Sequence, residues 1–226
     1  MKRRWAGLAW LTIILLPSLA FAHGVAGKDA SFLQQVDGVR FIPFLYLGAK
    51  HMVTGYDHLL FLAGVIFFLY RLRDVALYAS LFALGHSLTL LGSVLLGWQA
   101  NAHLVDAVIG LSVAYKAYEN IGGFKALGIT LDARLAVLGF GLVHGLGLAT
   151  KLQELSLSPN GLVLNMVGFN VGVELGQLAA LTLMVLLFAL WRSSASFERS
   201  ARGANLLLMT AGFVLCGYQL AGYWIT

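Results

Sequence analysis

Several ionisable or polar side chains lie inside stretches of sequence that are otherwise almost entirely apolar. They are Asp57, His58, His86, Glu119, His144, Asn170 and Glu174. A charge at the centre of a bilayer costs about 2.5–3.5 kcal/mol on insertion scales, so such residues serve a function by default. Imidazoles and carboxylates bind transition-metal ions and relay protons. The sequence therefore predicts a metal or proton site inside a membrane.

The composition agrees with a membrane protein. The 226 residues are 59% hydrophobic and only 11% charged, and the mean hydropathy is +0.82. A soluble domain carries about 25% charged residues, so this chain departs strongly from that class. The 26 glycines are typical of membrane helices that pack closely. The net charge of +5 comes from basic residues in short loops, which form no stripe, so we expect no nucleic-acid partner.

The amino terminus has the pattern of a secretory signal peptide. A basic region at residues 2–4 precedes an apolar core at residues 8–16, and Ala20-Phe21-Ala22 is a typical cleavage pattern. Residues 1–22 would then be removed. His23 would become the first residue and a candidate for an outer capture site. The alternative is an uncleaved first membrane helix.

The remaining chain predicts a short lead-in and one membrane domain. Residues 23–50 mix polar and apolar residues, and we expect them to form an extracytoplasmic segment. Residues 51–226 contain apolar segments that each approach the roughly 20 residues needed for a span. These segments are residues 51–70, 75–97, 103–121, 133–150, 161–191 and 204–225. We therefore predict an all-α, polytopic membrane helix bundle with six transmembrane helices after a cleavable signal peptide.

The charges of the short loops predict how the bundle is oriented. Basic residues follow the first, third and fifth segments, whereas Lys151 is alone in the other loops. The former are Arg71, Arg73, Lys125, Arg134, Arg192, Arg199 and Arg202. Cytoplasmic loops carry the excess of Lys and Arg. We expect a multi-pass protein of the bacterial inner membrane with both mature termini on the periplasmic side.

Helical spacing predicts which polar residues lie together. His51 and His58 are seven residues apart, so one continuous helix would present both on the same face, with His51 solvated near the outer interface. Asn170 and Glu174 are four apart and also share a face. At 1.5 Å per residue, most of the set lies in the central and outer bilayer. We expect one polar cluster that contains Asp57, His58, His86, His144, Asn170 and Glu174.

Glu119 is expected near the cytoplasmic end of its helix, apart from this cluster. With His103 and Asp106 at the outer mouth, it would complete a graded series of ligands, which suits a path that must release its ion. The alternatives are structural. Glu119 would extend to the cytoplasmic headgroups or pair with Lys116, and a single buried histidine such as His86 would bond a neighbouring helix.

Glycines occur at helical spacing on two of the apolar segments. Gly168, Gly172 and Gly176 form one row, and Gly141 and Gly145 form a pair. Small residues four apart let the backbones of membrane helices approach closely. We expect these rows to be packing faces.

Five short motifs occur in order between about residues 45 and 190. They are Thr54-Gly55-Tyr56-Asp57-His58-Leu59-Leu60-Phe61, Gly85-His86-Ser87-Leu88-Thr89, Tyr118-Glu119-Asn120, Gly141-Leu142-Val143-His144-Gly145-Leu146-Gly147 and Phe169-Asn170-Val171-Gly172-Val173-Glu174-Leu175-Gly176-Gln177. Together they resemble the HupE/UreJ family of membrane proteins, in the branch with the Gly-Tyr-Asp-His motif. The resemblance implies a six-helix nickel or cobalt permease linked to hydrogenase and urease maturation. It implies functional roles for Asp57, His58, His86, Glu119, His144 and Glu174.

We therefore expect a secondary permease, rather than an enzyme, that moves a divalent transition-metal ion into the cytoplasm. Nickel is the first candidate, and cobalt, zinc and copper share its preference for imidazole. The sequence has no nucleotide-binding motif. Membrane potential, a proton gradient or trapping by a cytoplasmic metallochaperone or metalloenzyme maturation protein would drive uptake. The expected partners are thus the metal ion, the lipid bilayer and such cytoplasmic proteins.

Two alternatives remain open. Three histidines with an open position also describe a catalytic zinc site, with Glu174 or Asp57 as general base in an intramembrane hydrolase. Against this, no His-Glu-x-x-His motif occurs, and the single Cys216 excludes a cysteine zinc cage. A third possibility is a metal-sensing or assembly subunit that binds an ion without transporting it.

Overall fold

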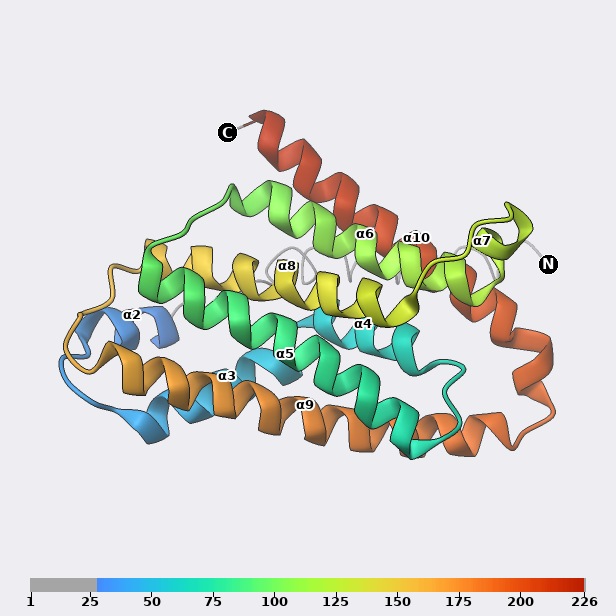
Figure 1. Ribbon diagram of the computed structural model, residues 1–226, viewed down its shortest axis with the longest axis horizontal. Coiled ribbons are helices and arrows are strands. Elements are labelled where there is room, and N and C mark those ends of the chain that lie inside the picture. The colour runs from blue at the N-terminus through green and yellow to red at the C-terminus, as the bar shows by residue number, and fades with distance from the viewer. Residues whose placement is uncertain (1–27, 226) are drawn as a thin grey trace, which may run out of the picture.

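The computed structural model describes residues 28–225, which form helices joined by loops (Figure 1). The predictions for the signal peptide and for His23 lie outside these residues. The helices are α2 (Lys28–Gln35), α3 (Phe41–Thr54), α4 (Tyr56–Ile66), α5 (Leu72–Leu96), α6 (Ala102–Asn120), α7 (Gly123–Ala126), α8 (Ala133–Glu154), α9 (Leu162–Arg192) and α10 (Ser196–Ile225). No strand occurs in the described part of the chain, so the all-α class is confirmed.

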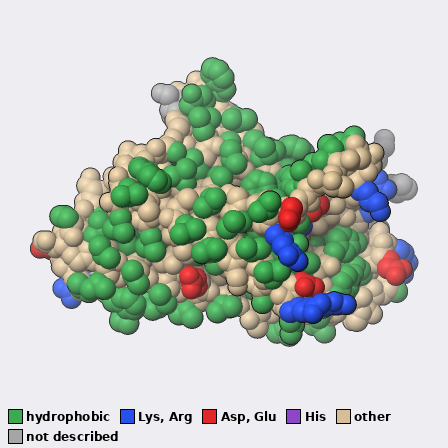
Figure 2. All heavy atoms as spheres, in the orientation of Figure 1, with side chains coloured by type: hydrophobic (Ala, Val, Ile, Leu, Met, Phe, Trp, Pro, Cys, Tyr) green, Lys and Arg blue, Asp and Glu red, His purple; other side chains and the backbone are tan. Residues whose placement is uncertain are grey.

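Four helices within residues 28–225 are long and apolar enough to cross a membrane, namely α5, α8, α9 and α10. Helix α6 has 19 residues but carries Asp106, Lys116 and Glu119, whereas α3 and α4 are each shorter than a span. The face shown in Figure 2 is largely hydrophobic, and most of its charged side chains gather near one end. The protein is thus a polytopic membrane helix bundle, and the count of six spans stays a prediction.

Glycines form the contacts of the three most extensive helix pairs, which are α3 with α9, α5 with α8, and α6 with α10. A β-carbon at Gly172 would overlap the α3 backbone, and one at Gly145 would overlap the α5 backbone. At Gly212 it would lie 2.5 Å from a backbone nitrogen of α6. The expected packing role of the glycine rows is confirmed, because only glycine permits these approaches.

The first apolar segment is not one helix. Helix α3 begins at Phe41 and ends at Thr54, and α4 starts at Tyr56 after an extended Gly55 with φ −73° and ψ 97°. The expected boundary at residue 50 therefore falls inside α3, and the prediction of a continuous helix over residues 51–70 is wrong. Gly55 weakens a helix by about 1 kcal/mol relative to alanine. Asp57 accepts a bond from the backbone N–H of His58 at 2.9 Å, which favours a new helix start.

The basic loops all lie at one end of the bundle, where α4, α6 and α9 end (Figure 1). Arg192, at the end of α9, donates from its guanidinium to the carbonyl oxygens of Phe67 at 2.7 Å and Leu69 at 2.9 Å, and also to that of Ile66. Carbonyl oxygens at the carboxyl end of a helix lack donors within that helix. The carbonyl oxygen of Ile66, the last residue of α4, also accepts from the backbone N–H of Leu69 at 3.0 Å, and Phe67 and Leu69 follow the helix. Arg192 therefore closes the end of the broken segment.

Candidate metal-binding site

Four histidines and one aspartate meet at the break between α3 and α4. His51 lies in the last turn of α3, and Asp57 and His58 in the first turn of α4, whereas His86 and His144 come from α5 and α8. All five residues are buried, with exposed fractions between 0% and 6%. The structure thus brings together the four central residues of the predicted cluster. The cluster also includes His51, which we had expected to be solvated near the outer interface.

His58 occupies the centre of this group, which we call the histidine cluster (His51, Asp57, His58, His86 and His144). Its ring centroid lies 5.1 Å from that of His51, 5.8 Å from His86 and 5.0 Å from His144. With metal–nitrogen bonds of about 2.1 Å, two imidazoles on one ion have centroids roughly 5 Å apart. The spacing therefore suits a shared ion.

The rings are close together but are not arranged as a complete metal-coordination site. Among residues 28–225, no three His, Cys, Asp or Glu side chains converge into a group that could hold a metal ion as they stand. The ring of His58 makes angles of 67° with His86 and His144 and 80° with His51. Binding one ion would require at least these rings to turn.

Hydrogen bonds set the protonation of two rings. Nδ1 of His58 lies 3.0 Å from Oδ1 of Asp57, and Nδ1 of His144 lies 2.8 Å from the carbonyl oxygen of Phe140. Because a carboxylate and a carbonyl oxygen accept hydrogen bonds, Nδ1 carries the proton in both rings. The lone pair that binds a metal is then on Nε2. Metal-ligating histidines are held by a carboxylate or a carbonyl in this way.

Aromatic side chains surround the cluster and exclude polar solvent. The ring of Phe82 lies 5.0 Å from that of His144, and the ring of Phe61 lies 5.4 Å from it. Phe169 packs 6.1 Å from His51. All three phenylalanines are almost fully buried. In these surroundings the charge of a carboxylate acts more strongly on a cation than it would in water.

Asn170 and Glu174 form a second polar group beside the cluster. Nδ2 of Asn170 donates to Oγ of Ser87 at 2.9 Å and to Oε1 of Glu174 at 3.3 Å. Ser87 follows His86 in α5, so this group lies on the α9 side of that helix. Asn170 is buried, whereas Glu174 is exposed. Asn170 therefore connects Ser87, the neighbour of His86, with Glu174, whose side chain is exposed.

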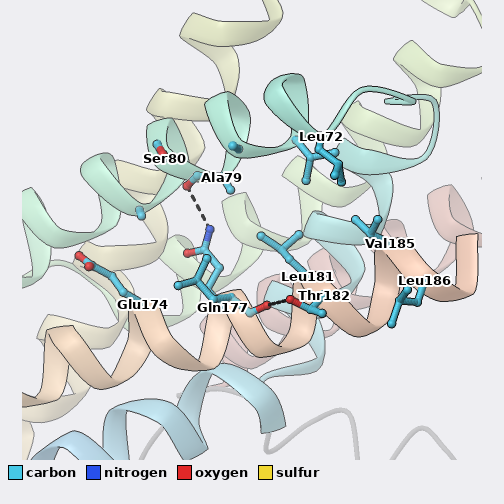
Figure 3. A pocket seen from close by; sticks show the side chains of 13 residues that line it. Leu72, Ala79, Ser80, Glu174, Gln177, Leu181, Thr182, Val185 and Leu186 are labelled. Carbon is cyan, nitrogen blue, oxygen red and sulfur yellow. Dashed lines mark hydrogen bonds between the residues drawn. The ribbon is translucent and has the colours of Figure 1, made fainter. Parts of the chain in front are cut away.

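Glu174 lies at one end of an apolar groove between α5 and α9 (Figure 3). The groove has a volume of about 660 Å³. Gln177 extends into the space between the two helices and donates to the carbonyl oxygen of Ala79 at 3.0 Å (Figure 3). Most of the remaining lining consists of leucine, valine and alanine side chains. Such a lining offers few ligands to an ion, so the groove is not part of the candidate metal site.

Glu119 lies apart from the histidines, near the end of α6 where the basic loops gather. Its Oε2 is 2.7 Å from Nζ of Lys116. The neighbouring Asn120 donates to the carbonyl oxygen of Gly64 at 2.8 Å and to Oδ1 of Asn205 at 2.9 Å. The structure thus shows the pairing with Lys116 that the sequence left as an alternative.

Sequence reasoning missed one charged pair near the cluster. Lys151, which the sequence suggested only as a loop charge, forms an ion pair with Asp106 at 2.7 Å. Asp106 was expected at the outer mouth but without a partner. The available signal was the seven-residue spacing of His144 and Lys151, which places both on one face of α8.

Fold and cluster together define a polytopic membrane protein with a buried cluster of four histidines and one aspartate. The family model described as "HupE / UreJ protein" matches residues 27–226, so the chain belongs to the HupE/UreJ family. This family is associated with nickel and cobalt transport, which agrees with a metal permease as the broad class. Comparison with curated proteins gave no match, and comparison with solved structures gave none either.

Proposed function

We propose that the protein is a secondary permease that carries a divalent transition-metal ion, nickel first, through the histidine cluster. The observation that supports this most strongly is the position of the cluster at a break in a membrane segment. Non-helical backbone is tolerated inside a membrane where it is buried in protein or lines a cavity. Discontinuous helices of this kind form the substrate and ion sites of many transporters.

The chemistry of the cluster fits such a cargo. Neutral imidazoles suit Ni(II), Co(II), Zn(II) and Cu(II), and Asp57 supplies negative charge to offset that of the ion. Affinity alone would favour copper, so geometry and metal supply must select nickel. Conduction also requires binding that is weak enough to permit release. An incompletely coordinated ion is released more easily than one held by a full set of ligands, so the arrangement of the cluster meets that requirement.

The direction and energy of transport follow from the charges of the loops. The end that carries the basic loops faces the cytoplasm in this proposal, which puts both mature termini on the periplasmic side of the inner membrane. A divalent cation that moves inward down a potential of 100 mV gains about 4.6 kcal/mol, at about 2.3 kcal/mol per charge. A cytoplasmic metallochaperone or maturation protein would receive the ion.

The test is metal uptake into proteoliposomes that contain the purified protein. Nickel, cobalt, zinc and copper are offered separately to the wild type and to the double variant His58→Ala with His144→Ala. Glu198→Gln is the control, because Glu198 is exposed in the first turn of α10 and lies outside the cluster. We expect uptake of one ion that the double variant loses and the control retains.

Other outcomes identify the alternatives. Equal uptake by the wild type and the double variant would remove the cluster from the transport path. Stoichiometric binding of zinc without uptake of any metal ion would instead favour the intramembrane hydrolase. Binding with neither flux nor hydrolysis would favour a sensing or assembly subunit.

A further inference from the structure

The ion pair of Lys151 and Asp106 has no role in the function proposed so far. Nζ of Lys151 lies 2.7 Å from Oδ2 of Asp106, and the two side chains are only 15% and 5% exposed. Taking two charges out of water carries a desolvation penalty that can exceed their mutual attraction. Ionisable residues inside a membrane bundle therefore mark a functional site by default.

The pair lies beside the histidine cluster, on the α8 side. Lys151 follows His144 by seven residues, so both share one face of α8 and lie about 10 Å apart along its axis. Gly147 is between them, and a β-carbon there would be 3.7 Å from Oδ1 of Asp106. The carboxylate of Asp106 therefore lies against α8 between Lys151 and the level of His144.

Two buried atoms near Lys151 are able to bind a cation. Oδ1 of Asp106 has no hydrogen-bond partner within residues 28–225, and in that part of the chain Nε2 of His51 has none either. Lys151 is close enough to His51 for an electrostatic interaction, and Asp106 is similarly close to Asp57. A carboxylate oxygen and an imidazole nitrogen thus lie near the ammonium group of Lys151.

We propose that Asp106 receives the divalent cation on its way to the histidine cluster and that Lys151 is its counter-charge when no ion is present. This inference rests on the proposed permease function and adds a receiving site to it. The arriving ion displaces Nζ of Lys151 from Asp106 and passes, with the help of His51, to the imidazoles. Lys151 returns when the ion leaves. Exchange of one cation for another keeps the buried carboxylate neutralised at each stage.

Opposite effects of the two partners distinguish this role from a structural one. Loss of the carboxylate in Asp106→Asn weakens capture, so the KM for nickel uptake rises about tenfold, which corresponds to about 1.4 kcal/mol. Loss of the competing ammonium in Lys151→Gln strengthens capture, so the KM falls severalfold and turnover slows. Lys151→Arg keeps the charge and retains a KM near that of the wild type.

The measurement is nickel uptake by proteoliposomes over a range of concentrations, with thermal unfolding of each variant as a check on folding. If Lys151→Gln does not fold, the neutral double variant Lys151→Gln with Asp106→Asn replaces it. Its KM should match that of Asp106→Asn alone, because the double variant also lacks the carboxylate. Shifts of KM in the same direction for both single variants, unchanged KM in folded variants, or a wild-type KM in the double variant would overturn the proposal.

Failure of the permease function gives a different result. In that case the wild type takes up no ion, and nickel binding to the protein in detergent micelles is measured by calorimetry. Opposite shifts of Kd for Asp106→Asn and Lys151→Gln would still support Asp106 as a receiving ligand. Equal values of Kd would overturn it.

Discussion

His51 and His58 belong to different helices, yet their ring centroids lie 5.1 Å apart. In a continuous helix, residues seven apart are separated by about 10.5 Å along the axis. The extended backbone at Gly55 interrupts the helix between them, and α4 starts in a new position relative to α3. The break therefore brings two imidazoles that are seven residues apart in the sequence into direct contact within one cluster.

Substitution of Gly55 tests this role of the break. A β-carbon at Gly55 would lie 2.9 Å from Nδ1 of His58 and 3.2 Å from Oδ1 of Asp57. Gly55→Ala should therefore disturb this pair and lower nickel affinity by about tenfold, the lower end of the loss seen when a group that orients a metal-binding histidine is disturbed. Calorimetry on the purified protein measures the affinity. Gly139→Ala is the control because nothing lies within 4 Å of its β-carbon. Equal affinities of the two variants would contradict the prediction.

The carboxylate of Asp57 should matter through its bond to His58. Asp57→Asn removes the charge that orients the ring, and we expect a loss of about 10–100-fold in nickel affinity with little change in thermal unfolding. Asp74→Asn, at the partly exposed start of α5, serves as the control and should bind nickel as the wild type does. Wild-type affinity of Asp57→Asn would show that the carboxylate does not support the site.

The close approach of α3 and α9 predicts a large effect on stability. A β-carbon at Gly172 would overlap the carbonyl oxygen of Leu45, so Gly172→Ala forces the helices apart. Overpacking of this kind costs about 1–3 kcal/mol in the free energy of unfolding. Thermal unfolding in detergent measures the loss. Gly217→Ala, in open space on α10, should leave the midpoint unchanged or raise it.

Glu119 should affect the rate of transport rather than the binding of the ion. It lies in the last turn of α6 and pairs with Lys116 at the end with the basic loops. We expect Glu119→Gln to slow nickel uptake while the affinity of the cluster stays at the wild-type value. The exposed Glu198 at the start of α10 supplies the control Glu198→Gln. Normal uptake by Glu119→Gln would exclude Glu119 as an exit residue.

The segment before α3 should loosen in acid. Asp37 accepts bonds from Asn160 and Ser158 in the loop before α9, each at 2.8 Å, and these bonds lower the pKa of its carboxyl below 3.8. The folded-state pKa is therefore below the unfolded one. The stabilisation is present above about pH 4 and is lost as the pH falls through the folded-state pKa.

Hydrogen exchange of residues 36–40, corrected for the intrinsic rate at each pH, measures this change. We expect protection to fall below about pH 4 in the wild type. Asp37→Asn carries no ionisable group, so its protection should not change over the same interval. Loss of protection in both proteins at the same pH would assign the effect to another group.

The sequence by itself determined the class of protein, the family and the central residues of the histidine cluster. Apolar length and loop charge are local properties, so they indicate a membrane bundle without knowledge of helix positions. The motifs around His58, His86 and His144 were sufficient to place these residues together, because each is a rare polar group on an apolar helix. The glycine rows likewise predicted close packing.

Only the tertiary structure decided which other polar groups join the cluster, because that depends on distances between helices. It buried His51 through the break at Gly55, which helical periodicity alone does not predict. The structure places Glu174 in the lining of the groove, although the four-residue spacing correctly predicted that Asn170 and Glu174 share a helix face. It also joined Asp106 to Lys151, two residues that are 45 positions apart in the sequence and meet because α6 packs against α8.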